Sequence, residues 1–201
     1  MKGLFITSGI FVGAVILSQI YTVVSTNRTE RQPYEVIRKE KDFEIRHYPA
    51  ATMAKITSSA KSYKELGNNG FRKLAGYIFG GNEGNQQIAM TSPVHMDIDD
   101  SSSTMSFVMP AAYNIANLPK PNNAEVIIET VPEEYIAAIT FGGFASDADM
   151  KKYSDLLEKA LKKADLKHDG NFRFLGYNPP FQLVDRTNEI IVRVEWVPLE
   201  Q

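Results

Sequence analysis

Three histidines are the side chains of this chain best suited to metal chemistry, and they are too scattered to form a metal cluster by spacing alone. His168 lies in a polar turn and is expected at the surface, whereas His95, which follows Pro93-Val94, is ambiguous. His47 differs, because the alternating pattern of a half-buried strand places it on the same face as Phe43 and Ile45. On strand parity alone, a half-buried histidine satisfied by hydrogen bonds is favoured over a metal ligand.

Other catalytic and metal-binding signatures are missing from the sequence. The absence of cysteine excludes disulfides, thiolate metal sites and a cysteine nucleophile. No serine-hydrolase, zinc-protease, phosphate-loop or dinucleotide-binding motif occurs. The acidic residues Asp97, Asp99 and Asp100 lack the spacing of a calcium loop, so a solvated loop is the better interpretation. The net charge of −2 gives no electrostatic reason to expect a nucleic-acid partner.

Five of the seven methionines lie in the middle of the chain. Methionine fills irregular core space, and it also lines broad hydrophobic pockets. Together with the aromatic residues, this group would suit a flat apolar ligand, although core packing explains it equally well. The five residues are Met53, Met90, Met96, Met105 and Met109.

The elements that must position these residues occur in the same order in the two halves of the chain. Glu125-Val126-Ile127 also repeats Glu35-Val36-Ile37 at an offset of 90 residues. The pattern predicts an α+β fold in which two helices pack against a curved sheet. Alternating and helical periodicity predicts strands at 34–39, 43–48, 51–56, 87–91 and 105–109 with a helix at 63–79, then strands at 125–127, 135–141, 172–175 and 190–196 with a helix at 147–164.

An uncharged apolar stretch from Gly3 to Asn27 precedes these elements, and it is long enough to cross a bilayer, which takes about 20 residues. We expect residues 1–27 to form a transmembrane anchor or signal segment, 28–33 a linker, and 34–201 one domain. The expectation is a single-pass anchor through residues 4–24 with the domain on the extracytoplasmic side. A cleaved signal, leaving a secreted or periplasmic domain, is the main alternative, and a buried soluble helix is a third. We expect the segment to contribute nothing to a binding site.

Six segments in order resemble the SOUL haem-binding protein family, over nearly the whole globular part from Tyr34 to Trp196. Each motif alone would be weak, and six in the right order with matching spacing make a strong signal. They are Phe43–Tyr48, Ile88–Val94, Met105–Pro110, Phe141–Phe144, Gly176–Pro180 and Asn188–Val192.

This resemblance implies a distorted antiparallel β-barrel built from two similar strand-strand-helix-strand-strand halves and flanked by two long helices. In this chain an N-terminal apolar helix would precede it. The resemblance also implies that haem or a related tetrapyrrole binds in an apolar surface cleft beside the first helix, with basic residues near its propionates.

Carried over to this sequence, the resemblance assigns His47 as a possible axial iron ligand, although some family members lack that histidine. Lys73 matches a basic position on the first helix, and we add Arg72 because it is adjacent. Both side chains suit carboxylates, lysine as a point charge and arginine as a bidentate fork. The expected pocket walls are Phe71, Tyr77 and Met90, with ordinary core packing as the alternative for each.

These observations favour a non-catalytic carrier, buffer or sensor of haem at a membrane. One alternative keeps the fold and changes the ligand, giving an effector-binding module for another amphipathic small molecule. Another is an enzyme that hydrolyses a tetrapyrrole or removes its metal, for which no residue spacing assigns roles.

Overall fold

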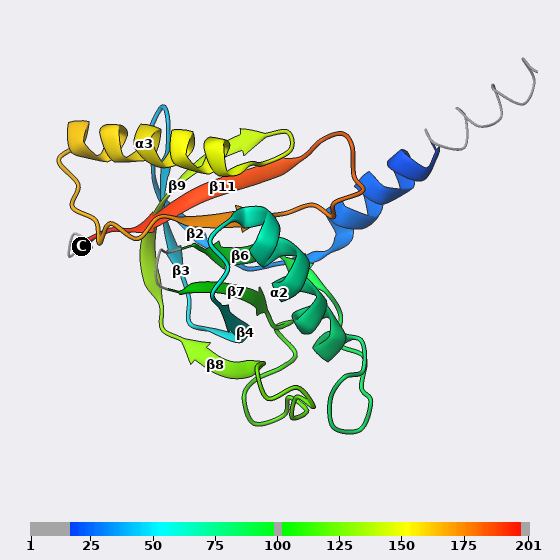
Figure 1. Cartoon of the computed structure of the whole chain (residues 1–201). Coiled ribbons are helices and arrows are strands. Elements are labelled where there is room, and N and C mark those ends of the chain that lie inside the picture. Colours follow the sequence, from blue (N-terminus) through cyan, green and yellow to red (C-terminus); the bar gives the residue numbers. More distant parts are fainter. Residues whose placement is uncertain (1–16, 99–101, 198–201) are drawn as a thin grey trace, which may run out of the picture.

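The computed structural model describes residues 17–98 and 102–197, which form a curled antiparallel sheet with two helices on its inner side (Figure 1). This arrangement confirms the predicted α+β fold. The helices are α2 (Tyr63–Ile78) and α3 (Asp147–Lys163), and the strands are β1 (Glu30–Arg31), β2 (Glu35–Lys39), β3 (Glu44–Tyr48), β4 (Ala51–Ser58), β5 (Thr91–Ser92), β6 (Val94–Asp97), β7 (Ser103–Val108), β8 (Ile127–Val131), β9 (Glu134–Gly142), β10 (Arg173–Gly176) and β11 (Thr187–Arg193).

Nine strands form an open half-barrel in the order β2-β3-β9-β11-β10-β6-β7-β4-β8, and β1 pairs separately with β5. Its inner order is symmetric, since β3-β9-β11-β10 corresponds strand by strand to β8-β4-β7-β6. The two similar halves therefore meet at the β10–β6 pair. Their helices begin 84 residues apart, at Tyr63 and Asp147. Because β8 corresponds to β3 and not to β2, the repeated Glu-Val-Ile triplet does not mark equivalent strands.

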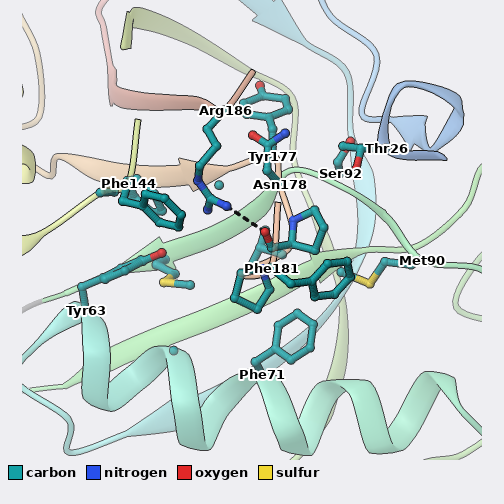
Figure 2. Close-up of a pocket in the computed structure, with 18 of the residues that line it drawn as sticks. Thr26, Tyr63, Phe71, Met90, Ser92, Phe144, Tyr177, Asn178, Phe181 and Arg186 are labelled. Carbon is teal, nitrogen blue, oxygen red and sulfur yellow. Dashed lines mark hydrogen bonds between the residues drawn. The ribbon is translucent and has the colours of Figure 1, made fainter. Parts of the chain in front are cut away.

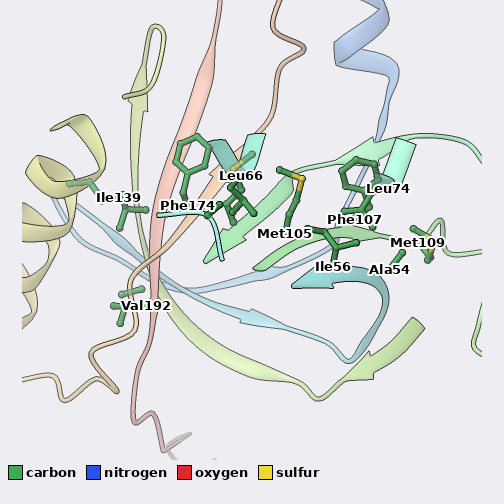
Figure 3. Packing of buried hydrophobic residues seen from close by; sticks show 14 of the residues in the cluster. Ala54, Ile56, Leu66, Leu74, Met105, Phe107, Met109, Ile139, Phe174 and Val192 are labelled. Atoms are coloured by element: carbon green, nitrogen blue, oxygen red, sulfur yellow. The ribbon is translucent and has the colours of Figure 1, made fainter. Parts of the chain in front are cut away.

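Each helix starts at a serine cap and buries one apolar stripe. Ser62 accepts a hydrogen bond from the backbone N–H of Glu65, and Ser146 forms a reciprocal capping box with Asp149, as serine does at many helix starts. The buried stripes pack against the sheet and join one continuous core (Figure 3). These stripes include Leu66, Leu74 and Ile78 from α2 and Leu157 and Leu161 from α3.

The predicted strand at 87–91 is largely a loop. The side chain of Asn82, which is buried, binds the carbonyls of Tyr77 and Gln86 and accepts from the backbone N–H of Gln86. This amide holds the turn before residue 87. Within the predicted strand, Gln87 forms an isolated bridge with Phe79, and the Ile88 backbone N–H donates to the Ile78 carbonyl at 2.8 Å, so these residues pair with the end of α2 instead of with a strand of the sheet. The sheet resumes in β5 and β6, which are separated by Pro93, a residue without a backbone N–H.

Strand β3 is buried on both faces, which corrects the expectation of a half-buried strand. On the outer face, Arg46 forms two 2.9 Å hydrogen bonds with Glu189 of β11, and these residues are 3% and 4% exposed. Glu189 also accepts from Thr140 at 3.0 Å and from Tyr177 at 2.7 Å. Burial together with nearby Glu189 raises the pKa of Tyr177, so the phenol stays a neutral donor. Period-2 reasoning missed this network because its members come from three strands and a loop.

The N-terminal segment corrects the expected localisation. Within residues 17–98 and 102–197, no helix is both long and apolar enough to cross a membrane. This finding overturns the single-pass anchor proposed for residues 4–24, of which residues 4–16 lie outside the described part. Residues 17–28 are helical and lie beside the loop after β10 (Figure 1). The amide of Gln19 bonds the backbone of Phe181 and Leu183, and Thr26 donates to Gln182 at 2.9 Å.

Candidate functional site

A cleft of about 840 Å³ lies over the seam between the two halves of the sheet (Figure 2). Its floor includes Val94 and Met96 of β6 and Phe174 of β10, the two strands that join the halves. Helix α2, the start of α3, the loop over residues 176–186 and the N-terminal helix form its walls. The cleft therefore lies over the β10–β6 pair, about which the strand order of the two halves is symmetric.

One stripe of α2 faces this cleft, and a different stripe packs on the sheet. Residues three, four, seven and eight positions apart share one helical face. Gly67 leaves room at the cleft wall, because a Cβ atom added there would have no heavy atom within 4 Å. The stripe consists of Lys64, Gly67, Asn68, Phe71 and Arg72.

The cleft walls carry large apolar side chains that remain partly accessible to solvent. Phe181 is 64% exposed, Phe144 57% and Phe71 37%. The Phe71 ring is held edge-on against buried Phe107, with ring centroids 5.3 Å apart. Figure 2 shows Phe71, Phe181 and Met90 gathered on one side of the cleft. Clustered exposed apolar groups of this kind indicate a binding surface.

Positive charge predominates among the residues that line the cleft. Lys64, Arg72 and Arg186 contribute three cations, and Asp147 is the one acidic residue in the lining. The Asp147 carboxylate accepts a 2.7 Å hydrogen bond from the backbone N–H of Tyr63. It therefore joins the starts of α3 and α2. The combination of aromatic walls and excess cations suits an anionic amphipathic ligand.

The structure brings together three of the six predicted site residues. Phe71, Arg72 and Met90 all line the cleft. Phe71 and Arg72 do so because they lie on the outer stripe of α2. Met90 does so from the loop before β5.

The other three predicted residues lie outside the cleft lining. His47 is half-buried, with its Nε2 atom 3.2 Å from Glu133 and its ring 4.8 Å from that of Tyr135. His47 therefore has a hydrogen-bond partner in Glu133, and its assignment as an iron ligand stays a prediction. Lys73 binds Glu125 at 2.7 Å and thereby lowers the pKa of that carboxyl. Tyr77 is core, and its hydroxyl donates to the Pro119 carbonyl at 2.9 Å.

Several lining residues escaped the sequence reasoning, notably Tyr63, Phe144, Phe181 and Arg186. Phe144 is the last residue of one segment that carried the family resemblance, Phe141–Phe144, and Phe181 directly follows another, Gly176–Pro180. The N-terminal helix also lines the cleft, contrary to expectation. Its contributing face is a stripe of hydroxyl-bearing residues at helical spacing that starts in the apolar segment and ends in the expected linker, comprising Tyr21, Thr22, Ser25, Thr26 and Thr29.

The described residues contain no group of three or more histidine, cysteine, aspartate or glutamate side chains that could hold a metal ion. The cleft nevertheless fits a tetrapyrrole by its chemistry. Aromatic and thioether surfaces suit the flat macrocycle, and the cations suit its carboxylates.

The chain belongs to the SOUL haem-binding protein family, whose match covers residues 29–193. It is 29% identical over 168 residues to heme-binding protein 2 of Mus musculus, covering 80% of this chain and 82% of the mouse protein. Identity to heme-binding protein 2 of Homo sapiens is 30% over 156 residues, covering 74% and 76%. For heme-binding protein 1 of Xenopus laevis it is 27% over 165 residues, covering 77% and 86%.

Solved structures share the fold at low sequence identity. The C-terminal domain of EcmrR superposes with a TM-score of 0.57 at 11% identity, covering 82% of this chain and 99% of that domain. A protein described as a hydrolase from Listeria innocua gives a TM-score of 0.55 at 7% identity, covering 79% and 94%. At such identities the similarity concerns the fold alone.

Proposed function

We propose that this protein binds haem or a related tetrapyrrole in the cleft between α2 and the 176–186 loop. The observation that carries the proposal is a cleft of about 840 Å³ with aromatic and methionine walls and three cations against one carboxylate. The names of the family and of the similar vertebrate proteins support the same ligand. A flat macrocycle would lie against Phe71 and Met90, with its carboxylates toward the cations.

The proposal retains Phe71, Arg72 and Met90 as contact residues and leaves the iron-ligand role of His47 as a prediction. When bound, haem would supply an iron able to take an axial ligand. His47 does not line the cleft, and its imidazole lies beside Glu133. We therefore expect binding in the cleft to depend on the apolar walls and the cations.

A haemin titration of the full chain, followed at the Soret band, tests the site. The Phe71→Ala change should weaken binding about tenfold or more, because a buried aromatic contact is worth about 1.5–3 kcal/mol. Phe79→Ala is the matched control, since Phe79 follows the same helix, is solvent-exposed and does not line the cleft. A titration without a saturable shift, or equal losses in both variants, would contradict this site.

His47→Ala belongs in the same experiment. We expect its haemin affinity to stay within about twofold of the unmodified chain. A large loss of affinity, together with a changed Soret position, would instead assign the iron-ligand role to His47.

We infer a carrier or buffer role without turnover. Phe144 and Phe181 are exposed at the cleft mouth, so a ligand can enter and leave without unfolding of the core. Haem should therefore pass intact to apomyoglobin, as absorption and mass spectra of the transferred ligand would show. Chemically altered tetrapyrrole after incubation with this protein alone would favour an enzyme.

A further inference from the structure

Arg186 lines the cleft immediately before β11, and Figure 2 shows it beside Phe144. Its Nη1 atom donates to the backbone carbonyls of Pro179 at 2.8 Å and Gln182 at 2.7 Å. Its guanidinium carbon lies 4.4 Å from the centre of the Phe144 ring. These contacts fix the orientation of the guanidinium group, but none of them neutralises its charge.

The edge of this guanidinium formed by Nε and Nη2 has no hydrogen-bond partner among the described residues. The Nε atom of Arg186 is buried and has no hydrogen-bond partner within residues 17–98 and 102–197. Among the described residues, every other buried side-chain nitrogen or oxygen atom has such a partner. Within the same part of the chain, Nη2 takes part in no hydrogen bond. The N–H groups of Nε and Nη2 point in the same direction and form the fork that a carboxylate engages with both oxygens. A buried donor without a partner is costly, so such a donor in a cleft points to a missing ligand atom.

No carboxylate of the described chain competes for this fork. Arg186 takes part in none of the ion pairs formed by residues 17–98 and 102–197. Asp147, the acidic residue of the lining, accepts instead from the backbone of Tyr63. Burial lowers the pKa of Arg186 and nearby Tyr63 acts in the opposite sense, but an arginine starting from 12.5 remains charged at neutral pH.

We propose that Arg186 receives a carboxylate of the cleft ligand through its Nε–H and Nη2–H groups and so selects acidic over neutral amphipathic molecules. This inference deepens the proposed function and rests on it for the placement of the ligand in the cleft. For a tetrapyrrole, the group bound would be a propionate. The aromatic surfaces would hold the apolar body, and Arg186 would set its orientation.

Paired acid and ester probes test this assignment on the full chain. Haemin is compared with haemin dimethyl ester by Soret titration, and 4-(pyren-1-yl)butanoate with its methyl ester by fluorescence. The unmodified chain should bind each acid roughly 10- to 100-fold more tightly than its ester, as expected for a charge-assisted hydrogen-bonded pair. In Arg186→Gln this preference should fall to about twofold or less, because acid binding weakens and ester binding does not.

Two further variants separate recognition from folding. Arg186→Lys keeps the charge without the fork and should restore only part of the preference for the acid. Arg193→Gln removes an exposed arginine outside the cleft lining and should change nothing. Thermal unfolding of each variant identifies any general loss of structure.

The outcomes distinguish this assignment from the proposed function. If haemin binds but neither acid is preferred over its ester, the role of Arg186 is overturned and the proposed function stands. If Arg186→Gln weakens acid and ester equally, Arg186 acts only as a structural residue, and the assignment is likewise overturned. If neither haemin nor its ester binds, the proposed function fails, and the pyrene pair alone decides whether Arg186 selects carboxylates.

Discussion

At the scale of single residues, His95 shows how burial decides what a histidine does. It is buried on β6, and its Nε2 atom lies 2.7 Å from the Gln32 side-chain oxygen. Burial lowers the pKa of His95 to about 3, and the charge of Arg173 acts in the same direction. The sequence alone did not indicate a role for His95. In the structure its neutral imidazole binds Gln32 and so holds the segment before β2.

We expect His95 to make stability depend on pH. The folded state holds the imidazole neutral, whereas the unfolded chain takes up a proton near pH 6.5. The contribution of His95 to the free energy of unfolding is therefore fully present above about pH 6.5. It is lost as the pH falls toward 3, by at most about 1.4 kcal/mol per pH unit. Urea unfolding between pH 7 and pH 4 measures the slope. His95→Gln should flatten it, and an unchanged slope would show that other groups cause the loss.

Two glycines of α2 allow a matched comparison of how glycine-to-alanine changes affect the free energy of unfolding. At Gly67 a Cβ atom meets nothing within 4 Å, whereas at Gly70 it comes within 3.1 Å of Ile56 and 3.3 Å of Met105. Alanine in a helix interior gains about 1 kcal/mol over glycine. Gly67→Ala should therefore raise the free energy of unfolding by about this amount, and Gly70→Ala should raise it less or lower it. Equal gains in urea unfolding would contradict the close packing at Gly70.

At the scale of elements, the Arg46–Glu189 pair holds the outer face of the sheet together across β3, β9 and β11. Removing Glu189 would leave buried Arg46 with the partly exposed Glu44 carboxylate, 2.9 Å away, as its remaining charged partner, so we expect a cost at the lower end of about 3–5 kcal/mol. Glu134 and Arg173 form a 2.8 Å pair that is partly exposed, and such pairs are worth about 1 kcal/mol or less.

Glu189→Gln and Glu134→Gln therefore form a matched comparison. We expect the first to lower the free energy of unfolding by about 3 kcal/mol and the second by about 1 kcal/mol or less. Chemical unfolding monitored by circular dichroism gives both values. Similar losses would mean that the buried network contributes no more than a partly exposed ion pair.

At the scale of the whole molecule, the N-terminal helix and the loop after β10 meet at the cleft. Helical residues 17–28 are tied to the loop after β10 by Gln19 and Thr26, and they line the cleft. This loop also carries Phe181. The cleft is therefore completed by segments about 160 residues apart, which explains why no local motif revealed its full outline.

We expect the chain that begins at residue 29 to bind haemin about tenfold more weakly than the full chain, because one wall of the cleft is removed. Thr26→Val should give a smaller loss, since it breaks the buried hydrogen bond to Gln182 and keeps the helix. Soret titration measures affinity, and circular dichroism checks the fold. Equal affinities in two well-folded chains would show that the N-terminal helix is not part of the site.

The parts of the site on α2 were the most predictable. Phe71 was expected as a pocket wall once the family resemblance was seen, and Arg72 was added because it is adjacent to Lys73; both line the cleft. Lys73 shows the limit of proximity in sequence, because one residue is about 100° of helix rotation, enough to turn it toward Glu125. Arg186 had no local signal, since its significance depends on carbonyls and an aromatic ring from two loops.

The sequence by itself determined the order of the helices and of most strands, the apolar helix faces and the family, because these depend on residues near one another in the chain. It also predicted Phe71, Arg72 and Met90 as site residues. Only the tertiary structure decided that the N-terminal segment forms a wall of the cleft, that β3 is buried on both faces, and that Arg186 lines the cleft with an unpaired Nε atom. Each of these depends on which distant segments meet, and pairing between strands far apart in the chain leaves no periodic pattern in the sequence.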